Sequence, residues 1–406
     1  MATTTELSGS PNFSGPPKSG FSLGKIWTDK KSRGVIVQVI AMAIFCAIVF
    51  YLASNVVENF QKLGKPFGFD FLKSESNYDI NQTLISYNSQ SSHARAAVVG
   101  ILNTLLVAFC GILLATFLGF ILGVLRLSPN WLVNKLAYCY IEFMRNVPVL
   151  VHILLVHGIL VNSLPHPREA LNFADNFYLS NRGFTMPQPL FQPLFWLVVA
   201  AFVIGVIYAF WYKRSARLKQ RATGEQSPVV WVMLASIIGL PILAYFLTGF
   251  PIEWQAPEQS RFNLKGGMAI KPEFLALWLA LSLYTAAFIA EIVRAGILAV
   301  NKGQSEAALA LGLPRKKTMN LVVIPQALRV IIPPLTSQYL NITKNSSLAI
   351  AIGYMDIVAT IGGISLNQTG REMECMIIVL ALYLTFSITI STFMNWYNKR
   401  IALVER

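Results

Sequence analysis

A group of polar side chains interrupts one of the long apolar stretches of this 406-residue chain. The group follows Pro333 and Pro334, where we expect a break in the span, because prolines inside a membrane span free backbone groups that neighbours or water must satisfy. A lysine among amides and hydroxyls supplies a cation and hydrogen-bond donors, which suit a carboxylate. We therefore predict a polar spot that lines a cavity. Its members are Asn341, Lys344, Asn345, Ser346 and Ser347.

A second group lies in the preceding apolar stretch and contains Tyr284, Thr285, Glu291 and Arg294. Charged groups in a span are costly and usually mark a pathway or a pair. Glu291 could receive an ammonium group while the Lys344 group binds a carboxylate, which together would suit a zwitterionic amino acid. An alternative stays open: Glu291 pairs with Arg294, three residues away on a helix, and Lys344 extends to the membrane interface.

A polar, alanine-rich loop, residues 303–325, separates the two groups. Ser305 and Glu306 form a helix start signal, and Gly312 followed by Pro314 forms a stop signal. We predict a short helix on the membrane surface, attached at both ends to spanning helices. Such a helix could lie in a groove of a soluble partner and transmit its motion. A solvated loop helix is the alternative.

Composition places these groups in a membrane. Apolar residues make up 54% of the chain and charged residues 13%, with a mean hydropathy of +0.54, whereas soluble domains have about 25% charged residues. Runs long enough to cross about 30 Å of hydrocarbon predict an all-α polytopic membrane protein with about eight spans. The predicted spans are 35–55, 97–125, 137–164, 194–212, 228–249, 274–298, 326–353 and 376–397.

Basic residues indicate the orientation of these spans. With a cytoplasmic N-terminus, the inside segments carry more lysine and arginine than the outside segments, so both termini should be inside. The net charge of +14 is spread over short loops beside the spans, and this pattern predicts topology rather than a nucleic-acid surface. The four cysteines lack CxxC spacing, which implies no disulfide framework and no metal site.

The span 97–125 carries small residues at intervals of four: Gly111, Ala115, Gly119 and Gly123. Such a stripe lets another helix approach closely, and close packing is a main source of helix association in lipid. We therefore assign this stripe to helix packing rather than to a cofactor.

The next span has a charged approach and two histidines. Glu142 and Arg145 share one helical face ahead of Pro148, and we expect an interfacial ion pair before a helix that begins at the proline. His152 and His157 have no carboxylate at ligand spacing, so we interpret them as core histidines.

These motifs carry a family resemblance. Glu306, Ala307 and Ala308, with Gly312 four residues after the second alanine and Val-Val-Ile ahead of Pro325, form one motif. This loop resembles the EAA loop of permease subunits in binding-protein-dependent ABC importers. Three further stretches, 145–148, 284–294 and 344–348, resemble the polar amino-acid branch of that family.

The resemblance implies a permease subunit that moves L-amino acids of polar or broad range across the bacterial inner membrane. The enlarged pattern looks like the longer permease subunits of general L-amino-acid uptake systems. Coupling to an ATPase would fall to Glu306, Ala307, Ala308, Gly312 and Pro325. The substrate pathway would include Tyr284, Glu291, Lys344, Asn345, Ser346 and Ser347.

The implied partners are a cytoplasmic ABC ATPase dimer, a second homologous permease in a heterodimer, and a periplasmic amino-acid-binding protein. Membrane lipid surrounds the chain, and no nucleic acid is expected. Because the sequence lacks a phosphate-binding P-loop motif, we expect ATP hydrolysis on a partner and no enzyme activity, catalytic residue, metal or cofactor in this chain. A self-contained secondary transporter is the alternative, although the two halves show no internal repeat.

The resemblance also implies a domain plan, with a five-span core divided by an insertion. The plan consists of a flexible basic cytoplasmic tail (1–33), an extra first span with a periplasmic loop (34–94), the first part of the core (95–164), an insertion with periplasmic loops and two spans (165–271), the second part of the core with the coupling loop 303–325 (272–400), and a cytoplasmic tail (401–406).

Overall fold

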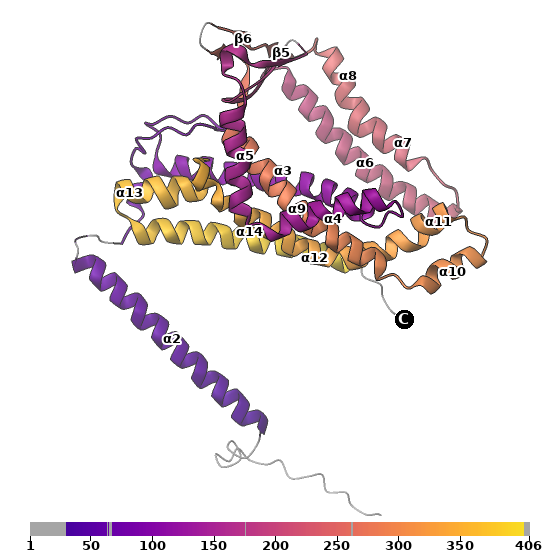
Figure 1. Cartoon of the computed structure of the whole chain (residues 1–406), viewed down its shortest axis with the longest axis horizontal. Helices are drawn as coiled ribbons and strands as arrows, with labels where there is room; N and C mark the ends of the chain where they lie inside the picture. The colour runs from indigo at the N-terminus through magenta and orange to yellow at the C-terminus, as the bar shows by residue number, and fades with distance from the viewer. Residues whose placement is uncertain (1–29, 63, 65–66, 175, 261–262, 402–406) are drawn as a thin grey trace, which may run out of the picture. The chain divides into compact units, whose positions relative to one another are not determined.

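The computed structural model describes residues 30–62, 64, 67–174, 176–260 and 263–401. The chain divides into two units, residues 1–68 and 69–406. The first unit holds one long helix, α2 (Lys30–Lys62), which contains the predicted span 35–55 (Figure 1). The predicted tails, 1–33 and 401–406, lie almost wholly outside the described residues.

The helices agree with the predicted number of spans. Among the described residues, seven helices are long and apolar enough to cross a membrane, and one bent pair raises the count to eight. Two of the seven pass through a π-helical turn: α7 (Val229–Leu234) continues into α8 (Leu240–Leu247), and α11 (Arg315–Thr318) continues into α12 (Ile324–Asn345). Besides α2, the continuous ones are α3 (His93–Leu125), α6 (Phe195–Thr223), α9 (Pro272–Leu298) and α14 (Glu372–Ile401).

The predicted single span 137–164 is wrong as one straight helix. The chain forms α4 (Trp131–Asn146) and α5 (Val149–Ser163), which meet at an angle of 106°. Pro148 lacks a backbone N–H and disfavours helical geometry in the residue before it, and Val147 is accordingly extended, with φ −103° and ψ 134°. The expected helix start at the proline is confirmed.

Helices α3 and α9 form the centre of the second unit, and the predicted stripe forms their interface. Gly111, Ala115, Gly119 and Gly123 are all buried. A Cβ atom on Gly119 would lie 2.5 Å from Ile289 Cγ2, and one on Gly123 would lie 2.8 Å from the carbonyl oxygen of Ala290. Residue numbers rise together along the two helices, so α3 and α9 run parallel.

Helix α12 packs against α9 and α14. Pro333 and Pro334 do not break this helix, contrary to the prediction, and α12 continues to Asn345. Membrane helices tolerate proline where neighbouring helices and side chains satisfy the freed backbone groups. The helix changes only at Ser346, where a 3₁₀ segment (Ser346–Ile352) begins. A π-helical segment (Val358–Ser365) and the short α13 (Leu366–Thr369) then lead to α14.

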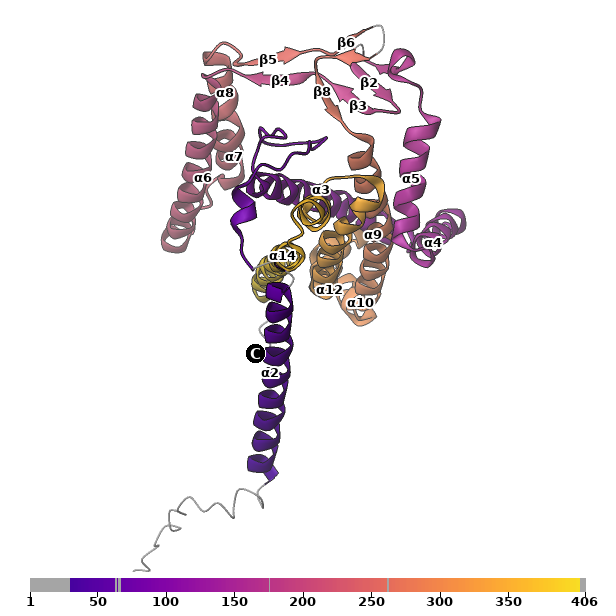
Figure 2. The same cartoon turned by 90° about the vertical axis from the view of Figure 1, so that its left-hand side faces the viewer.

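The insertion pairs two spans below a set of short strands. Helices α6 and α8 pack on each other, and a strand pair, β4 with β5, joins their ends (Figure 2). The sequence predicts no strands here, because segments of two to four residues are too short for an alternating pattern. The strands are β1 (Leu171–Phe173), β2 (Phe177–Ser180), β3 (Gly183–Met186), β4 (Gln188–Phe191), β5 (Ile252–Gln255), β6 (Glu258–Gln259), β7 (Leu264–Lys265) and β8 (Met268–Ile270).

The strands form a four-stranded antiparallel sheet in the order β1-β2-β3-β8 and two antiparallel pairs, β4-β5 and β6-β7. Strand β8 leads directly into α9, so the sheet is attached to the central helix pair. Two 3₁₀ turns, Asp70–Lys73 and Pro167–Glu169, complete the regular structure.

Candidate functional site

The loop between α9 and α12 contains the predicted surface helix, α10 (Lys302–Ala310). The helix begins three residues before the predicted start at Ser305, because Asn301 and not Ser305 caps it: the Asn301 side-chain oxygen accepts from Gly303 N at 2.8 Å. Figure 1 places α10 and α11 at one end of the bundle formed by α9, α12 and α14, and α13 at the other.

The predicted stop signal at Gly312 is confirmed. Gly312 has φ +79°, and its N–H donates to the carbonyl of Leu309 at 2.9 Å. The Leu313 N–H donates to the carbonyl of Ala308 at 3.1 Å. These two bonds form a Schellman motif, which favours glycine in the left-handed position. The local sequence therefore fixes both ends of α10.

Helix α10 exposes most of its surface. Of the motif residues, Glu306 and Ala307 are exposed, and Ala308 is buried against the rest of the chain. Leu311, beside the glycine, is 83% exposed. A Cβ on Gly312 would meet nothing within 4 Å, so the chain itself leaves open space at this end of the helix.

Hydrogen bonds join the surface helix to the span that follows it. Pro325 lies in the first turn of α12, directly after the π-helical turn Met319–Val323. The neighbouring Gln326 donates from Nε2 to Gln304 Oε1 at 3.2 Å, which links α12 to α10. The Thr318 hydroxyl donates to the Leu313 carbonyl at 3.3 Å. A displacement of α10 would therefore pull on α12.

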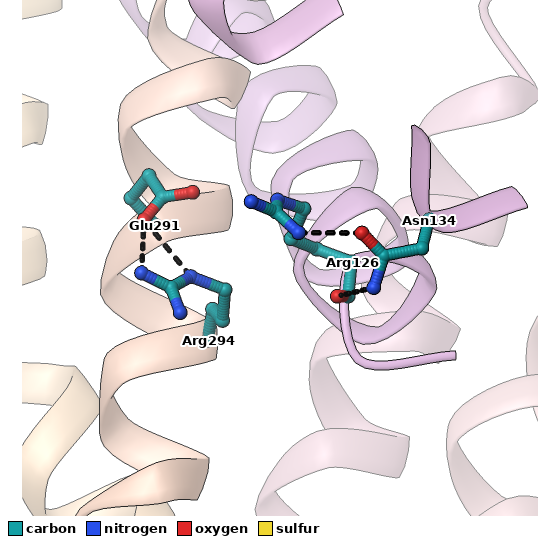
Figure 3. A network of polar contacts seen from close by, with 4 residues as sticks. All are labelled: Arg126, Asn134, Glu291 and Arg294. Carbon is teal, nitrogen blue, oxygen red and sulfur yellow. Dashed lines mark hydrogen bonds and ion pairs between the residues drawn. The ribbon is translucent and has the colours of Figure 1, made fainter. Parts of the chain in front are cut away.

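Glu291 is paired with Arg294, as the alternative interpretation held. Arg294 donates from Nε to Glu291 Oε2 at 3.0 Å, and its amino group lies 3.0 Å from the same oxygen. Figure 3 shows that the guanidinium group of Arg126, held by Asn134 on α4, is directed toward α9 at the level of this pair. The carboxylate of Glu291 is thus half-buried and paired with Arg294.

The side chains of the polar group at the end of α12 differ in their exposure to solvent. Lys344 is exposed, Asn345 and Ser347 are half-buried, and Ser346 is buried. The Ser346 hydroxyl donates to the Thr343 carbonyl and the Ser347 hydroxyl to the Lys344 carbonyl, both at 2.7 Å. Because both hydroxyl protons are engaged, the donors of this group that remain for a ligand are Asn341, which is exposed, Lys344 and Asn345.

The structure does not bring Lys344 and Glu291 to one level of the bundle. Ile342 of α12 packs beside Gly111, which also faces Ser282 of α9. At 1.5 Å per helical residue, Glu291 therefore lies roughly 14 Å further along α9. Tyr284, by contrast, is at the level of Lys344 and packs against His152, with ring centroids 6.0 Å apart. One amino acid could not reach both charged groups at once.

The residues ahead of α5 differ from the prediction. Glu142 accepts from Asn146 Nδ2 at 3.2 Å, while the Arg145 guanidinium lies 5.5 Å from the centroid of the Phe288 ring. The cation therefore packs on an aromatic ring of α9 in place of the expected ion pair. His152 is buried, and its Nε2 lies 3.3 Å from the Met144 carbonyl oxygen, which confirms it as a core histidine.

Asp356 is a buried carboxylate that is not among the predicted site residues. It lies between the spans 315–352 and 372–400, and it accepts from Ala359 N at 2.9 Å and from the Tyr383 hydroxyl at 3.2 Å. Burial raises the pKa of Asp356 to about 6. Nearby, Asn103 of α3 donates to the Met355 carbonyl at 2.9 Å. An acid directly after an apolar run was the signal that could have identified it.

Residues 227–403 match the family described as the inner membrane component of binding-protein-dependent transport systems. The chain is 47% identical to the general L-amino acid transport system permease protein AapQ of Rhizobium johnstonii, over 96% of this chain and 97% of that protein. It is 46% identical to the putative amino-acid ABC transporter permease protein YhdX of Escherichia coli, over 92% and 95%. It is 45% identical to the glutamate/glutamine/aspartate/asparagine transport system permease protein BztB of Rhodobacter capsulatus, over 97% and 99%.

Proposed function

Since the chain belongs to the family of inner-membrane permease components of binding-protein-dependent ABC transport systems, we propose that it forms part of the membrane pathway of an importer for L-amino acids of polar or broad range. Similarity over nearly the whole length to three amino-acid permeases carries this proposal. The same similarity favours an importer subunit over a self-contained secondary transporter.

The proposed machine requires further subunits. A cytoplasmic ATPase dimer would hydrolyse ATP, a periplasmic binding protein would deliver the amino acid, and a second homologous permease would complete a heterodimer. In this arrangement both termini and α10 face the cytoplasm, as the distribution of basic residues predicts. The domain plan, with a core of 95–164 and 272–400 divided by the insertion 165–271, belongs to this proposal.

Helix α10 is the proposed coupling element, with Glu306 and Ala307 exposed on it, Ala308 packed against the rest of the chain, and Gly312 at its end. Its exposure, the open space at Gly312, and the Gln304–Gln326 hydrogen bond to α12 support this role. A helix in a groove of the ATPase would transmit its movement through Pro325 and the first turn of α12 to the spans.

The proposed pathway passes two levels in succession. Lys344, Asn345, Ser346, Ser347 and Tyr284 would form the first level, where Lys344 binds the substrate carboxylate. Glu291 would form the second level, nearer α10, where its pair with Arg294 must open for an ammonium group to bind. Separation of the two levels suits stepwise passage better than a single site.

Gly312→Asp tests the coupling role. In cells that lack this chain, we expect the unmodified chain to restore ATP-dependent uptake of labelled L-amino acids and the variant to lose at least about tenfold, because charge and volume fill the space open to the ATPase. Gly224→Asp is a matched control: Gly224 ends α6 with φ +73° and nothing within 4 Å of a Cβ, so backbone strain of about 1 kcal/mol is common to both variants. Equal uptake by the two variants would contradict the coupling role.

Lys344→Met tests the first level of the pathway. The change keeps the side-chain length and removes the cation, so we expect a raised KM for uptake and unchanged assembly with the ATPase in pull-down experiments. Lys399→Met, at an exposed lysine in the last turn of α14, should leave the KM unchanged. If Lys344→Met left the KM unchanged as well, Lys344 would be an interfacial lysine and not a substrate ligand.

A further inference from the structure

A polar pocket lies where α3 passes into α4. It encloses about 560 Å³ and is lined by Arg126, Ser128, Trp131, Asn134, Lys135 and Tyr138 among others. Because α3 runs parallel to α9 and both end here, the pocket is at the same end of the bundle as α10. The proposed coupling and pathway residues take no part in it.

Two cations of the pocket share one aromatic ring. The Arg126 guanidinium lies 4.7 Å and the Lys135 Nζ lies 5.2 Å from the centroid of the Tyr138 ring. Among the described residues, neither cation forms an ion pair with a carboxylate, and Arg126 Nε is buried without a hydrogen-bond partner. The positive charge of the pocket is thus left for a ligand.

The pocket is built rather than incidental. Asn134 accepts from the Arg126 amino group and donates from Nδ2 to the Arg126 carbonyl oxygen at 2.7 Å, which fixes the arginine against α4 (Figure 3). Asn130 caps α4 by accepting from Leu132 N and Val133 N. Arg126 at the end of α3 is therefore held against α4, and Lys135 lies within α4 itself.

An apolar stripe begins at the pocket and follows α4. Leu132, Leu136, Cys139 and Phe143 have helical spacing and are all exposed. Trp131, which is 75% exposed, stands at the boundary, a position typical of tryptophan at the interface between headgroups and hydrocarbon. Cations at one end and an apolar stripe beyond them match an amphiphile with an anionic head.

We propose that this pocket binds the phosphate of an anionic phospholipid, with Arg126 and Lys135 at the phosphate and the acyl chains along the α4 stripe. A free phosphate ion would engage the cations but would leave the stripe unused. A zwitterionic lipid would bring its own ammonium group close to Lys135. This inference does not depend on the proposed transport function, because lipid binding is measured on the chain itself.

The test is a titration of the purified full-length chain with dioleoyl phosphatidylglycerol, followed by native mass spectrometry. We expect saturable binding that Lys135→Ala weakens about fivefold, the effect of one basic residue at an anionic membrane surface. Lys135→Arg should retain the affinity. The matched control is Lys316→Ala, an exposed lysine of α11 at the same end of the bundle, which should bind lipid like the unmodified chain.

Parallel titrations separate the possible ligands. Dioleoyl phosphatidylcholine should not bind saturably, and inorganic phosphate should not displace phosphatidylglycerol at equal concentration. Equal binding of the two lipids would overturn the proposal in favour of ordinary solvating lipid. Displacement by inorganic phosphate would overturn it in favour of a free-phosphate site. If Lys316→Ala weakened lipid binding as much as Lys135→Ala, the binding would reflect general surface charge and the proposal would be overturned.

Discussion

The α3–α9 pair of the core and the α6–α8 hairpin of the insertion use the same contact in different surroundings. Each pair closes around a glycine, Gly119 against Ile289 in the core and Gly205 against the backbone of Ser236 in the hairpin. Yet 61% of the residues in the most apolar stretch of α9 are buried, against 17% of those in α6 and 6% of those in α7–α8. Close approach of two helices therefore does not by itself make a core.

What differs is the number of layers around each pair. Helices α5, α12 and α4 pack on α9 in addition to α3, so a change at the central interface is transmitted through several helices. The hairpin packs chiefly on itself, and its large apolar side chains, such as Trp196, Phe210 and Leu247, remain exposed. Lipid or another subunit must cover these surfaces, while the core supplies its own packing.

Gly119→Leu should have the largest effect. The new side chain would occupy the space of Ile289 on α9, where a Cβ alone lies 2.5 Å from Cγ2, and overpacking costs about 1–3 kcal/mol or more. We expect a lower midpoint of thermal unfolding in detergent and little folded chain in the membrane. Gly158→Ala is the control, because a Cβ there lies 4.0 Å from its nearest neighbour. An unchanged midpoint for Gly119→Leu would mean that the α3–α9 interface is not close-packed.

Gly205→Leu should lower the stability of the fold less, although a Cβ there would also collide with a neighbour, the carbonyl oxygen of Ser236. The added side chain would push α6 away from Ser236, but few helices depend on that pair. We expect the main unfolding transition to change little while limited proteolysis at the α6–α7 loop, residues 224–228, becomes faster. A loss of stability as large as that of Gly119→Leu would show that the hairpin is part of the core.

Asp356→Asn should have the smallest effect near pH 4 and should change the pH dependence. Because burial raises the pKa of Asp356 to about 6 from 3.8, the folded chain binds a proton more tightly than the unfolded chain, and stability falls as pH rises from about 4 to about 6. The amide of asparagine can still accept from Ala359 N, as the protonated acid does, so the variant should unfold at a similar temperature near pH 4 and should not show this fall.

The hairpin offers the matched control for this pH profile. The hydrogen bond from Lys219 lowers the pKa of Glu225, so any contribution of Glu225 has the opposite sign and is lost as pH falls. The pair is exposed, and exposed pairs contribute little. Glu225→Gln should therefore leave the profile unchanged. The same flattening in both variants would mean that Asp356 does not govern the profile.

The sequence predicts features that depend on neighbouring residues or on one helix face. The spans, the Gly111–Gly123 stripe and the end of α10 at Gly312 are of this kind, because hydropathy, spacing and backbone freedom are local properties. The sequence also contains the signal for the start of α10, because Asn301 is a good cap, although the predicted start was Ser305. Short strands in the insertion carried no such pattern.

Relations between helices could not be read from the sequence in the same way. Lys344 and Glu291 were placed together by their chemistry, but the offset of α12 against α9 separates them, and that offset depends on contacts such as Gly296 with Ile331. Pro148 predicts that a helix begins there, but the sequence does not give the angle between α4 and α5. Asp356 has one local partner, Ala359 N, but its side-chain partner Tyr383 comes from α14, and that pairing could not be read from the sequence.

The parallel course of α3 and α9 has a consequence for counting membrane crossings. Two helices that traverse a bilayer in the same direction must be separated by an odd number of traverses. Helix α6 and the composite α7–α8 contribute two, so the bent pair α4–α5 must contribute one and cannot return to the side from which it came. The same parity means that the hairpin could be gained or lost as a pair without inverting α10, whereas the gain of a single helix would leave α10 on the wrong face of the membrane.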